Sequence, residues 1–168
     1  MAYETIKIKK YSDVIEEFTA ATAILPGQLV EQVPAAATLR KHATAGGNAI
    51  PMFALEDELQ GKGIDDAYAS GDKVQVWIPY RGDIVYACIA DEENIAIGDL
   101  LESNGDGMLR EHTVETWTSA DAQAANTVYS FPVVAIALEA KNLSTLPEGS
   151  DSSATGAYYH PRIKVRIV

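Results

Sequence analysis

Gly27-Gln28-Leu29-Val30-Glu31 returns later in the chain as Gly98-Asp99-Leu100-Leu101-Glu102, and this recurrence indicates the fold. Five further matches follow in the same order, so the chain contains an internal duplication. In the first copy they are Leu39-Arg40-Lys41-His42, Pro51, Ala54-Leu55-Glu56, Ala67-Tyr68 and Lys73-Val74-Gln75-Val76. Their counterparts are Leu109-Arg110-Glu111-His112, Pro132, Ala137-Leu138-Glu139, Ala157-Tyr158 and Lys164-Val165-Arg166-Ile167.

Each copy has the pattern of β-strands joined by tight turns. The glycine before Gln28 or Asp99 tolerates the positive φ of a turn, and the apolar alternation that follows has the period of a strand with one buried face. One copy alone would leave an apolar face and a sheet edge exposed, so two copies packed about an approximate two-fold axis are the simplest arrangement. The sequence therefore predicts an all-β fold with little helix: a compact β-barrel built from two duplicated modules, residues 24–78 and 95–168.

Length and composition fit one soluble domain, which we place at residues 13–168. A chain of 168 residues can bury roughly 70% of its unfolded surface. No apolar run approaches the ~20 residues that cross a bilayer, and the first residues lack the apolar segment of a signal peptide. We therefore expect a protein made in the cytosol that does not bind a membrane. The single cysteine, Cys88, lies in an apolar run and is expected to be a core residue.

Charge is distributed unevenly along the chain. The formal net charge is -11, yet residues 1–11 carry three lysines against one glutamate, and residues 157–168 carry three basic residues and no acid. The body between these ends is strongly acidic. A nucleic-acid partner is therefore not expected, because binding to phosphates requires a basic face.

Both basic ends alternate as strands do. Near the N-terminus Ile6 and Ile8 share one face while Lys7 and Lys9 share the other. Residues 1–12 are therefore predicted to be an N-terminal arm or an edge strand; an arm could add to the sheet of another chain. The C-terminal strand alternates in the same way and is expected to lie in the sheet of its own domain.

Three loops separate the predicted strands. Residues 43–48 are glycine-rich, and at the corresponding place the second copy is longer by about thirteen residues. This insertion, residues 113–130, contains Trp117 and Tyr129 and is expected to hold a short helix near residues 119–125. Residues 142–156 form the third loop, rich in Ser, Gly, Pro and acids.

Catalytic and metal-binding patterns are weak. His42 and His112 occupy equivalent places in the two copies, but the duplication predicts opposite ends of a two-fold barrel for them, and neither has ligand spacing to other residues. The carboxylates of Asp65-Asp66 and Asp91-Glu92-Glu93 stand in polar turns, which favours a solvated surface. We predict no catalytic residues, no metal site, no cofactor and no enzymatic activity.

Several of these segments together resemble the capsid decoration, or cement, proteins of tailed bacteriophages. The resemblance covers residues 18–138. It is carried by Ile24-Leu25-Pro26-Gly27-Gln28-Leu29-Val30, Asp66-Ala67-Tyr68-Ala69-Ser70-Gly71-Asp72-Lys73-Val74, Ile95-Ala96-Ile97-Gly98-Asp99-Leu100-Leu101-Glu102, Gly105-Asp106-Gly107-Met108-Leu109 and Val134-Ala135-Ile136-Ala137-Leu138-Glu139. What it implies is a small all-β protein that binds the outside of a matured icosahedral head, often as a trimer. Such a protein clamps neighbouring major capsid protein subunits.

The expected function is therefore that of a structural virion protein on the outer capsid surface, with the major capsid protein and its own copies, as a homotrimer, for partners. We expect two contact regions. The arm would bind through Tyr3, Ile6, Lys7, Ile8, Lys9 and Tyr11, and the insertion through Trp117 and Tyr129.

The alternative is a carbohydrate- or receptor-binding β module. It would use Trp77, Trp117 and the pair Tyr158-Tyr159 as stacking platforms. Burial of these aromatic side chains would argue against it.

Overall fold

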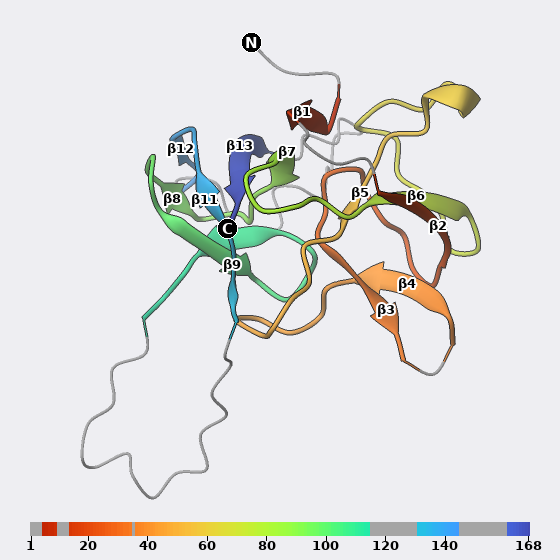
Figure 1. The fold of residues 1–168 in the computed structure, drawn as a ribbon, viewed down its shortest axis with the longest axis horizontal. Helices are drawn as coiled ribbons and strands as arrows, with labels where there is room; N and C mark the ends of the chain where they lie inside the picture. The colour runs from red at the N-terminus through yellow and green to blue at the C-terminus, as the bar shows by residue number, and fades with distance from the viewer. Residues whose placement is uncertain (1–4, 10–13, 35, 115–130, 145–160) are drawn as a thin grey trace, which may run out of the picture.

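The computed structural model describes residues 5–9, 14–34, 36–114, 131–144 and 161–168, and the regular elements among them are almost all β-strands (Figure 1). The all-β prediction is confirmed. The strands are β1 (Lys7–Lys9), β2 (Ile15–Ala20), β3 (Val30–Val33), β4 (Thr38–Lys41), β5 (Phe53–Ala54), β6 (Lys73–Trp77), β7 (Ile84–Cys88), β8 (Asn94–Ile95), β9 (Leu100–Ser103), β10 (Leu109–Glu111), β11 (Val133–Ala137), β12 (Lys141–Asn142) and β13 (Arg162–Ile167). One 3-10 turn, η1 (Glu58–Gln60), follows β5 and is capped by the carboxylate of Asp57.

The strands form two main sheets. A six-stranded sheet has the order β1-β7-β13-β11-β9-β10, and a five-stranded sheet has the order β3-β4-β2-β6-β5. Strands β8 and β12 make a separate pair. The C-terminal strand pairs along its length with β7 and with β11, as expected for a strand of the domain's own sheet.

The two sheets repeat the same strand arrangement, so the duplication seen in the sequence is a duplication of structure. Gly27 N donates to Ala54 O at 2.8 Å, and Gly98 N donates to Ala137 O at 2.9 Å. The backbone bonds His42 N to Leu29 O and His112 N to Leu100 O match in the same way. Strands β2, β3, β4, β5 and β6 therefore correspond to β7, β9, β10, β11 and β13.

The described strands form no closed barrel, which corrects that part of the prediction. Each copy, together with the strand that precedes it (β2 or β7), folds into its own curled sheet, because the two together supply five strands. In the first copy the edge strands β3 and β5 meet around an isolated bridge between Leu29 and Phe53. In the second copy β10 meets the end of β7 around an isolated bridge between Ile89 and Leu109.

The sequence match between β6 and β13 differs by two residues from the match that the strand pairing gives. Ala54 pairs with Val76, and its counterpart Ala137 pairs with Val165. Val76 thus corresponds to Val165 and not to Ile167. A shift of two leaves every side chain on the same face of a strand, so apolar alternation cannot distinguish the two registers.

The largest core cluster joins the two halves of the chain. Leu29, Phe53 and Trp77 from the first half pack with Leu101 and Val165 from the second, and all five side chains are buried. Backbone bonds also cross between the halves: Cys88 N to Gly27 O, Leu29 N to Gly107 O and Gly46 N to Ser103 O. Figure 1 shows the two sheets lying beside each other. The fold is one sandwich-like body.

The N-terminal strand β1 lies at one edge of the six-stranded sheet, antiparallel to β7. Ile6, directly before it, is 0% exposed and belongs to the main core. Of the two forms predicted for residues 1–12, the described part has that of an edge strand.

Three other predictions fall on residues that the structure does not describe. The short helix at residues 119–125 and the aromatic residues of the insertion lie in 115–130, and most of the third loop lies in 145–160. Within the described ranges, no helix is long and apolar enough to cross a membrane.

Candidate interaction surface

Strand β1 is anchored to both halves of the chain. Thr5 Oγ1 donates to one oxygen of the Glu56 carboxylate at 2.5 Å, and Ile6 N donates to the other at 3.2 Å. On its other side Ile6 O accepts from Tyr86 N at 2.8 Å. The strand is thus held by a charge-assisted pair of bonds in addition to its ladder.

The residues predicted to form a gripping arm lie in different settings. Ile6 is a core residue, which corrects its assignment to a capsid-binding surface, because a side chain with no exposed area cannot contact a partner. Lys7 and Ile8 are half-buried. Lys9 is the last residue of β1. Tyr3 and Tyr11 lie outside the described residues.

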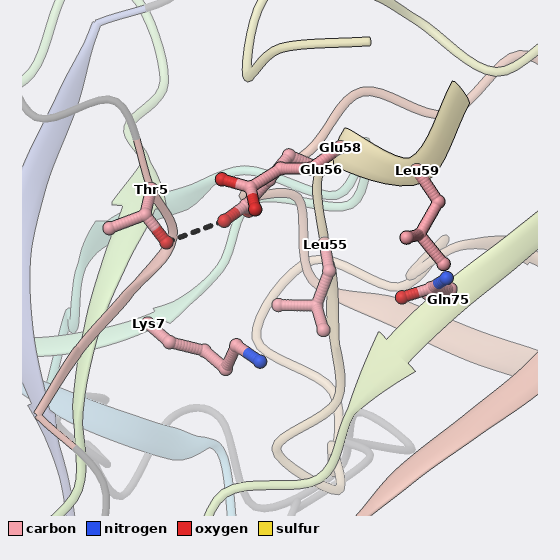
Figure 2. A pocket seen from close by; sticks show the side chains of 7 residues that line it. All are labelled: Thr5, Lys7, Leu55, Glu56, Glu58, Leu59 and Gln75. Atoms are coloured by element: carbon pink, nitrogen blue, oxygen red, sulfur yellow. Dashed lines mark hydrogen bonds between the residues drawn. The ribbon is translucent and has the colours of Figure 1, made fainter. Parts of the chain in front are cut away.

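A small pocket opens beside this anchor (Figure 2). Thr5 points to Glu56, and Lys7 extends from β1 toward Leu55. The volume is about 210 Å³, below the ~300–1,000 Å³ of typical small-molecule sites. The pocket is therefore too small to enclose a ligand of ordinary size. Its full lining is Thr5, Lys7, Leu55, Glu56, Glu58, Leu59 and Gln75.

Each copy of the repeat contains the same glutamate, arginine and histidine. In the second copy Glu102 accepts from Arg110 Nη2 at 2.7 Å and contacts His112 Nδ1 at 2.6 Å. In the first copy Glu31 accepts from Arg40 Nε at 2.8 Å, and its other oxygen lies 3.8 Å from His42 Nε2. The triplet ties β3 to β4 and β9 to β10.

The two histidines are not at opposite ends of the fold, contrary to the sequence-based expectation. His42 Nδ1 lies 2.8 Å from Ser103 Oγ, and Ser103 follows Glu102, the partner of His112. Both histidines therefore contact strand β9. The reason is that the halves pack with β9 next to the loop after β4, as the bond from Gly46 N to Ser103 O shows.

The His42 and Ser103 pair does not form an accessible nucleophile. Ser103 is 0% exposed, and its hydroxyl oxygen accepts from Gly105 N at 3.1 Å. A substrate cannot reach it in this arrangement, since nucleophilic catalysis requires the reacting oxygen to face a substrate. Among the described residues, no group of three or more His, Cys, Asp or Glu side chains is placed to hold a metal ion.

Arg162 joins the two halves from inside. Its guanidinium donates to Pro26 O from Nε at 3.2 Å and from Nη2 at 3.0 Å, and it also donates to Ile64 O. Nη1 donates to Asp65 Oδ1 at 2.8 Å. Burial alone would lower the pKa of Arg162, but the neighbouring Cys88 and Asp65 outweigh it and the pKa is raised. Arg162, from the second half, thus binds Pro26, Ile64 and Asp65 of the first half, and we call this set of contacts the clamp.

Cys88 lies beside Arg162, and its thiol loses its proton only at high pH. Burial raises the pKa of the thiol to about 11, from an ordinary value of 9.0, and Arg162 opposes part of that rise. The Cys88 Sγ hydrogen bond to Pro26 O, at 3.5 Å, keeps the thiol within the interface between halves.

We predict a loss of stability in alkali that depends on Cys88. Between about pH 9 and pH 11 the unfolded chain releases the thiol proton while the folded chain keeps it, so the free energy of unfolding falls as pH rises. At pH 10.5 the loss relative to pH 8 is about 2 kcal/mol. Urea denaturation at both pH values should show a smaller loss in Cys88→Ala than in the wild type. Equal losses in the two proteins would contradict the assignment.

Exposed apolar side chains gather at the base of the insertion. Phe131 and Ile50 are 76% and 70% exposed. Phe131 N donates to Asn48 Oδ1 at 2.9 Å, which ties the end of the insertion to the loop that carries Ile50. Val114, at the other end of the insertion, is 73% exposed. We call Ile50 and Phe131 the insertion base.

Of the aromatic residues considered as stacking platforms for a sugar, the structure describes Trp77. Trp77 is 0% exposed and packs in the main core, so it cannot stack on a sugar. Trp117, Tyr129, Tyr158 and Tyr159 lie outside the described residues. Trp77 is therefore excluded as a stacking residue of the carbohydrate-binding alternative.

Sequence reasoning missed the clamp and the insertion base. The sequence left open whether the basic side chains of the C-terminal strand face solvent or the acidic body of the protein. Arg162 is buried by the first half and donates to Asp65. Phe131 directly follows the predicted insertion, so the sequence did indicate that it could lie at an exposed contact. The glutamates of the repeated triplet were also visible, because Glu, Arg and His recur at matching places in both copies.

No protein-family model and no curated protein matches the chain. Among solved structures, the chain is similar to the head fiber gp8.5 N base of bacteriophage phi29, with a TM-score of 0.50 and 13% sequence identity. The match covers 94% of this chain and 95% of that chain. At this identity the likeness shows a shared fold, over nearly the full length of both.

Proposed function

We propose that the chain is a structural protein of a bacteriophage virion. The observation that carries this is the likeness of fold, over nearly the full length of both chains, to the N base of a phage head fiber. The sequence motifs that resemble capsid decoration proteins support the same class independently. Together they favour a role in the particle over a role in metabolism.

In the finer form of the proposal, the protein binds the outer surface of the head and stabilises contacts between major capsid protein subunits as a homotrimer. A three-fold assembly would bring three weak contacts to one site and raise the effective concentration of each. The insertion base is the contact that we assign to this role. Exposed aromatic and large apolar side chains are enriched at the centres of protein interfaces.

Mixing the purified protein with mature heads of the phage that encodes it should give saturable co-sedimentation. The double variant Ile50→Ser with Phe131→Ser should bind at least about tenfold more weakly, since it removes apolar area at the contact. The control is Leu59→Ser on η1, which lies away from β9 and the insertion ends in Figure 1. Leu59 is 93% exposed, so its replacement should leave binding unchanged.

Absence of saturable binding to these heads would overturn the proposal. Normal binding by the Ile50→Ser, Phe131→Ser variant would leave the virion role in place but exclude the insertion base as its contact.

A further inference from the structure

The edge of strand β2 lacks a neighbour that its counterpart β7 has. In the second copy, Lys7 and Lys9 of β1 pair with Val85 and Ile84 of β7. In the first copy β2 pairs with β6 on one side, but on the other it meets β4 only at its last two residues, 19 and 20. Within the described ranges, no strand pairs with residues 15–17 on that side.

Backbone bonds fix which residues of β2 and β7 correspond. Ile78 N donates to Val14 O at 2.9 Å, and Ile167 N donates to Asp83 O at 3.0 Å. At the other end, Ala21 N bonds to Leu39 O as Ala90 N bonds to Leu109 O. Residues 15–17 of β2 therefore occupy the places of residues 84–86 of β7, which β1 covers.

The uncovered edge is exposed and acidic. Ile15 is 39% exposed, and Glu16 and Glu17 are also exposed. Glu16 stands where β7 has the buried Val85, the residue paired with Lys7. Glu17 lies 3.8 Å from Lys73, but both side chains are more than half exposed, so this pair contributes little. Both carboxylates remain accessible to a strand added at this edge.

We propose that the edge of β2 at residues 15–17 binds an extended, lysine-rich segment of a partner protein, which adds to the sheet as an antiparallel strand. Main-chain bonds to an unpaired edge supply affinity, and opposite charges across the new pair select a basic occupant. β1 shows which sequence such an edge accepts, since Lys7-Ile8-Lys9 fills the equivalent place in the second copy. The proposal rests on the virion role, in which the partner is the capsid protein.

A second copy of this chain fits the edge less well than a partner. Its basic strands are β1 and β13. β1 is already held by the buried Ile6 and by the two bonds to Glu56, and β13 is paired on both sides, with β7 and β11. Releasing that strand would expose the Ile6 side chain to water. The occupant must therefore come from a chain whose basic segment is free.

The test is a nuclear magnetic resonance titration of the full-length, ¹⁵N-labelled protein. The probe is a capped peptide with the sequence of residues 5–10, Thr-Ile-Lys-Ile-Lys-Lys. Saturable shifts are expected at the amides of residues 15–17. The variant Glu16→Lys with Glu17→Lys should bind the peptide at least about tenfold more weakly. The control, Glu92→Lys with Glu111→Lys, makes the same charge change at exposed sites of the other half and should bind normally.

Three results would overturn the inference. One is shifts confined to residues 84–86, which would mean that the peptide displaces β1. Another is undiminished binding by a Glu16→Lys, Glu17→Lys protein whose dispersed spectrum shows that it is folded. The third is equal binding of a peptide with glutamate in place of each lysine.

Co-sedimentation with heads separates this inference from the proposed function. If the Glu16→Lys, Glu17→Lys variant binds heads as the wild type does, the edge is not the docking site and the virion role stands. If the peptide binds at residues 15–17 but the wild type does not bind heads, the virion role and the capsid partner fail.

Discussion

Replacing Arg162 with methionine is expected to lower the free energy of unfolding by about 3–5 kcal/mol. The guanidinium is buried and donates to the carbonyl oxygens of Pro26 and Ile64 and to the Asp65 carboxylate. Methionine fills much of the space but donates no hydrogen bond, so Ile64 O loses the bond from Arg162 and Pro26 O keeps only the weak bond from the Cys88 thiol. Urea denaturation followed by tryptophan fluorescence measures the change.

Arg166→Met is the matched control for this prediction. Arg166 lies four residues further along β13, on the same face, but it is exposed where Arg162 is buried. Its replacement should change stability by less than about 0.5 kcal/mol. Similar losses in the two variants would show that Arg162 does not act through its buried contacts.

Gly27→Ala should be the second most damaging single change, with a loss of about 2–4 kcal/mol. Gly27 has φ of +89°, where a side chain is strained. A Cβ atom there would also lie 3.0 Å from Tyr86 O, 3.1 Å from Arg162 Nε and 3.2 Å from Cys88 Sγ. The added methyl group would press directly on the clamp between the halves. Thermal and urea denaturation both report the loss.

The duplication supplies the control for Gly27. Gly98 is its counterpart and has a similar φ of +98°, but nothing lies within 4 Å of a Cβ built there. Gly98→Ala should therefore show only the backbone strain, about 1–2 kcal/mol. If Gly98→Ala destabilises the protein as much as Gly27→Ala does, the crowding around Gly27 has no energetic effect.

Much of the fold could be predicted because the same turn residues and the same apolar alternation occur twice in the sequence. The glycine turns at Gly27 and Gly98 and the alternation after them determine strand direction and buried face over a few residues. Those features gave the all-β class, the order of equivalent strands and the C-terminal strand. They act locally, so one sequence is enough to see them.

The relations between distant strands could not be predicted in the same way. The two-residue displacement of the β13 match keeps every side chain on its face, so nothing in the alternation opposes it. Whether two copies close one barrel or fold as separate sheets depends on which edges meet, as at the bridge between Leu29 and Phe53. The burial of Arg162 also depends on a surface contributed by the other half.

The candidate contacts were predicted only in outline. The insertion was located from its extra length, and Phe131 adjoins it, but exposure of Ile50 depends on the path of the loop after β4. The open edge of β2 was not visible in the sequence. It is recognised only by comparison with β7, whose edge is occupied by β1.

The clamp between the halves has a consequence for what a duplicated chain can do. Arg162 corresponds to Lys73, since Val165 corresponds to Val76, yet the Lys73 side chain is 62% exposed. A homodimer of half-length chains must place each residue at both symmetric positions. Fusion of the two copies into one polypeptide removes this constraint, so a guanidinium can be buried on one side while its counterpart stays in solvent. The molecule is a duplicated fold whose two copies carry different side chains at equivalent positions.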